Sequence, residues 1–260
     1  METSPLISVI TCTYNAAATL ERTLRSVARQ TYPRVEHLLV DGCSTDGTFA
    51  RIQRYVERGM PYSVRVVREP DAGLYDAMNK GIRQASGDYI VFLNAGDALH
   101  DEDSLSRVAA ALDWARGDLR STAIAYGETD IVDAEGRFVR HRRLKTPERL
   151  TWRSFREGMR VCHQSFYVRR DLALATPFDL RYRYSADFDW CVRLLKYVGR
   201  RRLPVVNTHA VLTDYLQEGM TTQNHRASLL ERWRVMCRHY GWGTTAVMHL
   251  WFCLRALYMR

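Results

Sequence analysis

The sequence of 260 residues lacks the patterns that mark several common classes of protein. Its six cysteines form no C-x-x-C pair and show no Cys/His spacing typical of zinc, so we expect reduced cysteines in a cytosolic protein. The N-terminus has no basic segment followed by a long apolar stretch, and no apolar run reaches the roughly 18 residues of a membrane span. We therefore expect no signal peptide, no membrane-spanning helix and a cytoplasmic location.

Two phosphate-binding patterns are also missing. No G-x-G-x-x-G follows the first apolar run, and no G-x-x-x-x-G-K-[ST] occurs in the chain. These absences weaken the hypotheses of a dinucleotide-binding protein and of a P-loop protein.

Positive charge is unevenly distributed along the chain. The formal net charge is +9, yet residues 1–98 hold 11 Lys/Arg and 11 Asp/Glu, so the whole excess follows residue 98. Residues 137–160 hold nine Lys/Arg and two Glu. Such a segment attracts phosphates, an anionic membrane or nucleic acid, and a solvated basic face is an equally good interpretation.

The first hundred residues alternate short apolar runs with helical periodicity. ISVITCTY, VEHLLV, SVRVV and YIVFL are each followed by apolar residues at helical spacing. This alternation predicts a parallel sheet with helices on both faces, in which ligands bind beyond the carboxyl ends of the strands. The polar segments expected at that edge are 13–15, 41–46, 69–73 and 94–97.

The second half of the chain has a different pattern. Two strand-like segments flank 133-DAEG-136 as in a hairpin, VCHQSFYV reads as a strand, and a helix is expected over 186–198. An irregular strand region to about residue 222 precedes a helix over 224–240. Residues 244–260 are apolar and aromatic, which suits either an interfacial helix or a helix packed on the protein's own core.

Several ordered segments together resemble glycosyltransferase family 2, the nucleotide-sugar transferases with the GT-A fold. They are 11-TCTYNAAATLERTLRSVARQTYP-33, 41-DGCSTDGT-48, 69-EPDAGLYDAMNKGIRQASGDYIVFLNAGD-97, 161-VCHQSFYVRRDL-172 and 185-SADFDW-190. The resemblance implies an α/β protein with a Rossmann-like, mostly parallel sheet and a C-terminal helical extension. It implies a catalytic domain over 1–222, divided into a nucleotide-binding half (1–98) and an acceptor-binding half (99–222), and an extension over 223–260 that contacts either membrane or core.

The resemblance also implies a set of donor-binding residues. They are Thr13, Tyr14, Asn15, Asp41, Asp71, Gly73, Asn79, Lys80, Asn94 and Ala95. Asp41 would accept a hydrogen bond from the nucleobase, whereas we favour a helix-capping role for Asp46, because S-T-D-G before a helical pattern makes a good turn and cap. For Asn79, a role on the helix face is as plausible as one at the ligand.

In the family, the fourth strand ends in an acidic cluster that holds Mg²⁺ or Mn²⁺ against the diphosphate. Only Asp97 of that cluster is present here, and Asn94 and Gly96 stand where many relatives have Asp. One carboxylate can suffice, because Mg²⁺ often takes its remaining ligands from phosphate and water. His163 and His209 are either further ligands or, more simply, structural or acceptor-side residues.

The resemblance assigns the catalytic base to Asp187. Carboxylates at i and i+2 point in different directions on a helix or strand, so Asp189 is expected to be structural, and Trp190 either packs in the core or flanks an acceptor sugar. The expected activity is inverting transfer of a sugar from a nucleotide-diphosphate sugar, with UDP favoured, to a hydroxyl of a glycan, lipid-linked for preference. The expected setting is bacterial surface polysaccharide synthesis, peripheral to the cytoplasmic face of the inner membrane.

Two other functions remain open on the sequence. A nucleotidyltransferase would normally carry a Gly-rich, basic phosphate loop after the first strand, and 12-CTYNAAA-18 has neither Gly nor Lys. A catalytically silent nucleotide-sugar-binding module would account for the reduced acidic cluster but not for the retained Asp41, Asp97 and Asp187. Nucleic acid is not an expected partner, because the aromatic residues are not regularly interleaved with the basic ones.

Overall fold

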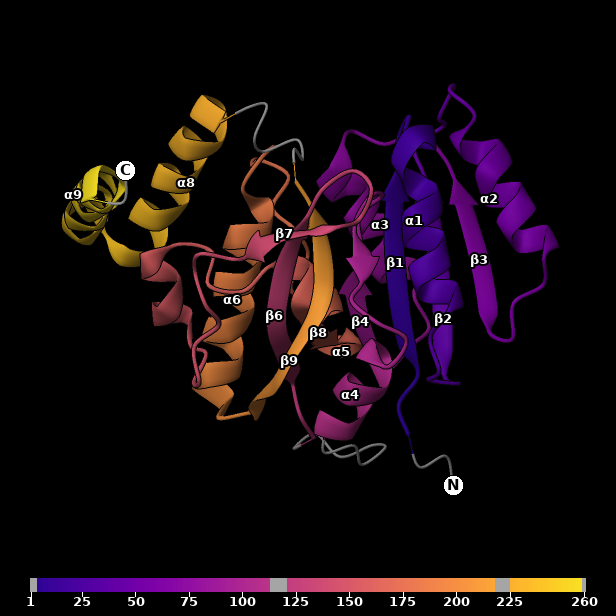
Figure 1. The fold of residues 1–260 in the computed structure, drawn as a ribbon. Coiled ribbons are helices and arrows are strands. Elements are labelled where there is room, and N and C mark those ends of the chain that lie inside the picture. Colours follow the sequence, from indigo (N-terminus) through magenta and orange to yellow (C-terminus); the bar gives the residue numbers. More distant parts are fainter. Residues whose placement is uncertain (1–3, 113–120, 218–224, 259–260) are drawn as a thin grey trace.

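The computed structural model describes residues 4–112, 121–217 and 225–258 (Figure 1). The strands are β1 (Ile7–Thr13), β2 (Val35–Asp41), β3 (Ser63–Arg68), β4 (Tyr89–Phe92), β5 (Ala98–Leu99), β6 (Ile124–Val132), β7 (Phe138–His141), β8 (Phe166–Arg169) and β9 (Val205–Leu216). The helices are α1 (Ala17–Ala28), α2 (Thr48–Glu57), α3 (Leu74–Gln84), α4 (Ser104–Ala111), α5 (Arg170–Ala175), α6 (Ala186–Arg201), α8 (His225–Tyr240) and α9 (Trp242–Tyr258). Two 3-10 turns, η1 (Trp152–Glu157) and η2 (His163–Ser165), complete the described elements.

The strands form one sheet in the order β3-β2-β1-β4-β8-β6-β9-β5, with β7 paired to β6. The four N-terminal strands are mutually parallel, as predicted. The second half is mixed, because β8 runs antiparallel to both of its neighbours, β4 and β6, while β9 runs parallel to β6. The sheet is therefore parallel where strands alternate with helices and mixed where a hairpin interrupts that alternation.

Helices cover both faces of the sheet, as predicted (Figure 1). Successive residues of β1 point to opposite faces, so Ile10 packs with α3 and α6 while Val9 packs with α1 and α4. Both β1 and β2 are buried along their whole length, so their apolar residues pack on both faces of the sheet.

The predicted hairpin is present, and β6 pairs antiparallel with β7. The predicted strand over VCHQSFYV is shorter than expected, because His163, Gln164 and Ser165 form the turn η2 and the strand begins at Phe166. The Ser165 amide donates to the Cys162 carbonyl at 3.0 Å and closes that turn. The polar residues His163 and Gln164 therefore lie in a turn and not in the strand.

The C-terminal helices α8 and α9 lie at the end of the molecule opposite β3 and α2 (Figure 1). His239 of α8 donates through Nε2 to Asp189 of α6 at 2.8 Å, and the ring of Tyr240 stacks on Trp152 of η1. In the part of the chain that the structure describes, no helix has both the length and the apolar character to cross a membrane. The domain boundary predicted at 222/223 lies outside the described residues.

Two helical glycines provide a matched test of packing. A Cβ at Gly81 of α3 would lie 2.5 Å from Cγ2 of the buried Ile10, whereas a Cβ at Gly199 of α6 would meet nothing within 4 Å. We expect Gly81→Ala to lower the free energy of unfolding by about 1–3 kcal/mol through overpacking. We expect Gly199→Ala to raise it by about 0.5–1 kcal/mol, because alanine loses less backbone entropy in a helix. Urea unfolding measures both changes, and equal effects of the two substitutions would contradict the packing of α3 on β1.

Candidate active site at the carboxyl edge of the sheet

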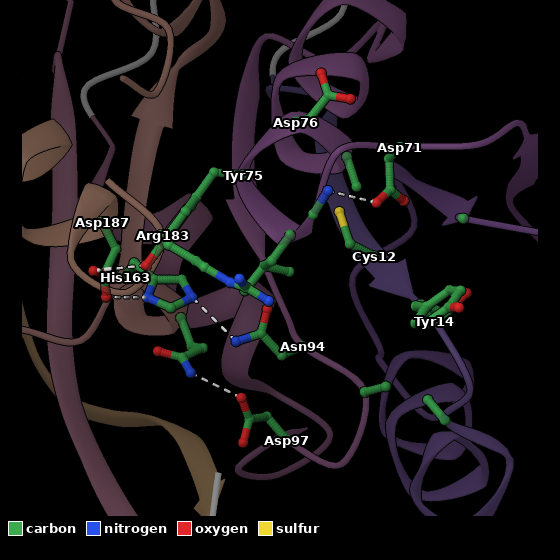
Figure 2. Close-up of a pocket in the computed structure, with 18 of the residues that line it drawn as sticks. Cys12, Tyr14, Asp71, Tyr75, Asp76, Asn94, Asp97, His163, Arg183 and Asp187 are labelled. Carbon is green, nitrogen blue, oxygen red and sulfur yellow. Dashed lines mark hydrogen bonds and ion pairs between the residues drawn. The ribbon is translucent and has the colours of Figure 1, made fainter. Parts of the chain in front are cut away.

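A cavity of about 1310 Å³ opens at the carboxyl ends of the parallel strands (Figure 2). One wall consists of segments that follow β1 to β4. We call it the donor wall, because the residues expected to bind the donor lie on it. The other wall comes from the second half of the chain and includes His163, Gln164 and Asp187. The expected donor-binding residues that line the cavity are Thr13, Tyr14, Asp71, Gly73, Asn94 and Ala95.

Tyr14 is the most exposed aromatic side chain of the donor wall, with 64% of its surface accessible. It follows the last residue of β1, and its ring stands at one end of the cavity (Figure 2). An exposed, fixed ring of this kind offers a flat surface on which a nucleobase can stack.

Asp41 and Asn15 brace the loops behind this wall and do not line the cavity. Asp41 is fully buried and accepts hydrogen bonds from the hydroxyls of Thr13, at 3.0 Å, and Ser44, at 2.5 Å. Asn15 Oδ1 accepts from the Thr45 amide at 2.9 Å. These contacts fix the loops after β1 and β2 to each other, so both residues shape the donor wall from behind.

Asp46 lies where two helices begin. Its carboxylate accepts from the backbone amide of Thr48, the first residue of α2, and from that of Ala17, the first residue of α1, each at 3.0 Å. The side chain satisfies otherwise free amides at both helix starts. The capping role expected for Asp46 is therefore present in the structure.

The loop after β3 brings Asp71 to the cavity, and the first turn of α3 brings Asp76 (Figure 2). Asp71 Oδ1 accepts from the Gly73 amide at 2.9 Å, and a Cβ at Gly42 would lie 2.2 Å from Asp71 Oδ2, so any side chain at position 42 would displace the Asp71 carboxylate. Gly73 has φ +121°, in the region that favours glycine.

Asn79 and Lys80 are expected to bind the donor, but their side chains do not line the cavity. The Asn79 amide is buried and exchanges hydrogen bonds with the backbone of Phe178, at 3.0 and 2.8 Å. The Lys80 ammonium donates to the Pro70 carbonyl at 2.5 Å and pairs with Glu69 at 3.2 Å. Of the two interpretations of Asn79, the structure shows the one in which it serves helix packing.

Asp97 lies on the cavity wall after β4 and is only 4% exposed. Its Oδ2 accepts from Gln164 Nε2 at 2.8 Å, and its Oδ1 accepts from the Leu216 amide at 3.0 Å. Burial raises the pKa of Asp97 to about 6, although both donors act to lower it. Gly96 has φ +105°, in the region that favours glycine, and a Cβ there would lie 2.8 Å from the Leu216 side chain, so this backbone disfavours a second aspartate beside Asp97.

Asp187 begins α6 on the opposite wall, next to His163 (Figure 2). Asn94 Nδ2 donates to His163 Nε2 at 3.2 Å, so the ring proton is on Nδ1, which donates to Asp187 Oδ2 at 3.2 Å. Tyr75 donates its hydroxyl to Asp187 Oδ1 at 3.1 Å. Burial alone would raise the pKa of Asp187, but the hydrogen bond from His163 and the charge of Arg232 hold it below its usual value. The carboxylate is therefore ionised and oriented at neutral pH.

His163 and Gln164 connect the two carboxylates. His163 holds Asp187 and Gln164 holds Asp97, and both side chains come from the turn η2. Sequence reasoning missed Gln164 and Tyr75 as site residues. The adjacent histidine and glutamine in a segment read as a strand were the available signal, because one of two neighbouring strand residues would have had to face the core.

Asp189 and Trp190 point away from the cavity. Asp189 is fully buried between Arg193 Nε, at 2.5 Å, and His239 Nε2, at 2.8 Å. The Trp190 indole is also fully buried, stacks on Phe178 at 4.6 Å and donates to the Thr176 carbonyl. Of the two interpretations of Trp190, core packing is the one observed, and the acceptor-side placement is corrected.

The cavity offers a metal ion one carboxylate at the expected place. Among the described residues, no group of three or more His, Cys, Asp or Glu side chains is arranged to hold a metal. His209 lies outside the cavity, 3.6 Å from Glu148. The buried Asp97 still fits a hard cation, because a bound cation would offset the cost of burying this charge and oxygen is the donor that such cations prefer. The remaining ligands would have to come from a phosphate group and water.

Comparison with known proteins agrees with this geometry. The model of the family described as Glycosyl transferase family 2 matches residues 8–175. The chain is 36% identical over 217 residues to a PGL/p-HBAD biosynthesis glycosyltransferase of Mycobacterium bovis (strain BCG / Pasteur 1173P2), covering 83% of this chain and 78% of that protein. The chain therefore belongs to glycosyl transferase family 2 and is a glycosyltransferase.

The chain is also similar to a second curated glycosyltransferase in sequence and to a solved structure in fold. Over 93 residues, 36% of each chain, the protein is 42% identical to TuaG of Bacillus subtilis (strain 168), a glycosyltransferase named for teichuronic acid biosynthesis. The crystal structure of S. aureus TarS 1–349 in complex with UDP is similar in fold, with a TM-score of 0.64 at 20% identity. That similarity covers 90% of this chain and 64% of the TarS chain, and it identifies the fold as GT-A.

The contacts of Asp187 predict how its ionisation depends on His163. We expect His163→Ala to raise the pKa of Asp187, because the substitution removes a hydrogen bond that favours the carboxylate while burial remains. His163→Gln, whose amide can still donate to the carboxylate, should raise it less. Carboxyl ¹³C NMR across a pH titration measures the shift.

The control is His141→Ala, which removes a histidine bonded to Asp130 rather than to Asp187. It should leave the Asp187 titration unchanged. An Asp187 pKa that is the same in His163→Ala and in the unmodified protein would show that His163 does not stabilise this carboxylate.

Proposed function

We propose that the protein is an inverting glycosyltransferase that moves a sugar from a nucleotide-diphosphate sugar to an acceptor hydroxyl. The observation that carries the proposal is the ionised Asp187, which faces the donor wall across the cavity and has fixed hydrogen bonds to His163 and Tyr75. A carboxylate held in this way can accept a proton from a hydroxyl placed between the two walls.

The proposed reaction follows from this arrangement. Asp187 takes the proton of the acceptor hydroxyl while its oxygen attacks the anomeric carbon of the donor sugar. The bond from that carbon to the diphosphate oxygen breaks, and the nucleoside diphosphate leaves with the bonding electrons. Because the attacking oxygen approaches opposite the leaving group, the configuration at the anomeric carbon inverts. His163 and Tyr75 keep the carboxylate turned toward the hydroxyl.

We propose that the nucleotide binds along the wall formed by the loops after β1 to β4. The exposed Tyr14 ring suits stacking on the base, and Asp71 and Gly73 border the place of the ribose and diphosphate. UDP is the favoured nucleotide, and the fold similarity to a protein crystallised with UDP supports this choice. Asn15, Asp41, Asn79 and Lys80 act indirectly, by holding the loops and α3 in place.

We propose that Asp97 holds Mg²⁺ or Mn²⁺ with the diphosphate. A bound cation would supply charge neutralisation for the leaving diphosphate. Gln164 and the Leu216 amide fix the carboxylate that would hold it, and each oxygen retains a lone pair for a metal bond.

The proposed acceptor is a glycan, lipid-linked for preference, in bacterial surface polysaccharide synthesis at the cytoplasmic face of the inner membrane. The names of the relatives from Mycobacterium bovis and Bacillus subtilis support a role in surface glycan or glycolipid assembly. The helix α9 supports the membrane part. Met248 and Phe252 pack toward the core, whereas Val247, Leu250, Trp251 and Leu254 form an exposed stripe at helical spacing.

We expect Asp187→Asn to abolish sugar transfer while nucleotide binding persists, because the amide cannot accept the proton but keeps the shape of the side chain. Transfer to a polyprenyl-linked glycan primer and nucleotide affinity by calorimetry measure the two effects. UDP should bind more tightly with Mn²⁺ or Mg²⁺ than with EDTA, and Asp97→Ala should remove that difference.

Three outcomes would contradict parts of this proposal. Full transfer by Asp187→Asn would exclude Asp187 as the base. Metal-independent UDP binding, unaltered in Asp97→Ala, would make Asp97 structural. Nucleotide-sugar binding with neither transfer nor hydrolysis would favour a silent binding module.

The stripe on α9 predicts membrane binding. We expect Leu250→Ser/Trp251→Ser to reduce flotation with vesicles that contain phosphatidylglycerol, because the pair loses apolar surface that the bilayer interface would bury. Leu174→Ser, at an exposed leucine of α5, is the matched control and should not change flotation. Equal flotation of all three proteins would remove the membrane from the proposal.

A further inference from the structure

Arginines line the cavity wall that belongs to the second half of the chain. Arg142, Arg183 and Arg232 all face the cavity, and none forms an ion pair with a carboxylate within the described residues, whereas Arg65, Arg137 and Arg181 do. Arg142 is partly engaged, because one of its nitrogens donates to the Met159 carbonyl at 2.6 Å. Arg183 and Arg232 have no comparable side-chain hydrogen bond in the described part of the chain.

Arg232 reaches the cavity from α8, beyond the region that the family model matches. Its guanidinium lies 5.6 Å from the ring of Phe188, and its Nε is buried without a hydrogen-bond partner among the described residues. A buried donor left without a partner is costly. A ligand that accepted hydrogen bonds from this guanidinium would reduce the cost.

Glu231 brings Arg183 to the same wall. Its carboxylate accepts the backbone amides of residues 183, 184 and 185 at 2.9, 2.7 and 3.1 Å. This clamp fixes the segment before α6 against α8, beside Arg232. The Glu231 carboxylate is occupied by amides, and the Arg183 side chain points into the cavity near His163 (Figure 2).

Arg183 and Arg232 lie on the cavity wall that also carries Asp187, the proposed base. The charge of Arg232 acts on Asp187, and Arg183 lies four residues before Asp187 in the sequence. Asp71 and Asp76 occupy the donor wall opposite. Planar guanidinium groups bind phosphate through paired N–H donors, with more directional hydrogen bonds than an ammonium provides. Arg183 and Arg232, on the wall opposite the donor wall, are therefore better placed to bind a phosphate of the acceptor than the diphosphate of the donor.

We infer that Arg183 and Arg232 bind a phosphate group of the acceptor and thereby set the acceptor hydroxyl against Asp187. The inference rests on the proposed function, since it takes Asp187 as the base. One consequence follows for that base. The charge of Arg232 lowers the pKa of Asp187, so a bound phosphate that offsets this charge would make the carboxylate more basic when the acceptor is in place.

The test uses the full chain saturated with UDP and a divalent cation, with geranyl diphosphate as an anionic lipid probe and geraniol as its uncharged match. We expect the protein to bind geranyl diphosphate but not geraniol in calorimetry. Arg183→Gln and Arg232→Gln should each weaken binding about tenfold or more, because each removes a charge-assisted hydrogen bond. UDP affinity should stay unchanged in both variants. Arg234→Gln, at an exposed arginine of α8 that does not line the cavity, is the matched control.

Glycerol 3-phosphate as a second probe separates the two sources of an acceptor phosphate. Tighter binding of geranyl diphosphate assigns the phosphate to a lipid carrier, and equal binding assigns it to the glycan. Unchanged geranyl diphosphate affinity in the protein that carries both Arg183→Gln and Arg232→Gln would overturn the inference. So would no binding of either phosphate compound by a protein that binds UDP. Loss of UDP affinity in the arginine variants would assign them to the donor and overturn it as well. A protein that binds no nucleotide would instead contradict the proposed function.

Discussion

The hydrogen bonds of the His163–Gln164 turn join the two halves of the cavity. Gln164 reaches Asp97 at the end of the parallel sheet, and His163 reaches Asp187 at the start of α6. The donor wall and the wall opposite come from different halves of the chain, so their relative position depends on contacts that cross between them. Short polar side chains on one rigid turn fix that position more closely than separate loops could.

Charge is divided across the cavity in the same way. Asp71, Asp76 and Asp97 lie on the donor wall, and Arg142, Arg183 and Arg232 lie on the other. A negatively charged donor wall repels a diphosphate unless a cation intervenes, which agrees with the proposed metal at Asp97. These three arginines are part of the basic excess found in the second half of the sequence.

The helix α8 contributes to the candidate site as well as to the surface, because its Arg232 lines the cavity. Glu231 clamps the segment before α6, and His239 donates to the buried Asp189 of the same helix. The start of α6, where Asp187 lies, is thus positioned from α8. The region that resembles the family least in sequence therefore takes part in placing a residue that the family resemblance identified.

The sequence by itself determined the parallel first half of the sheet, the hairpin, the long helices and the edge at which the site lies. Those features follow from periodicity and strand direction, which are local properties. It did not determine which polar residue of a loop faces the cavity. Asp41 and Asn79 carry suitable groups but use them on neighbouring backbone and hydroxyl groups, while Gln164, Tyr75 and Arg232, which the sequence did not single out, line the cavity. Only tertiary structure decided these roles, because a side chain's hydrogen-bond partners come from residues distant in the sequence and depend on how the two halves pack.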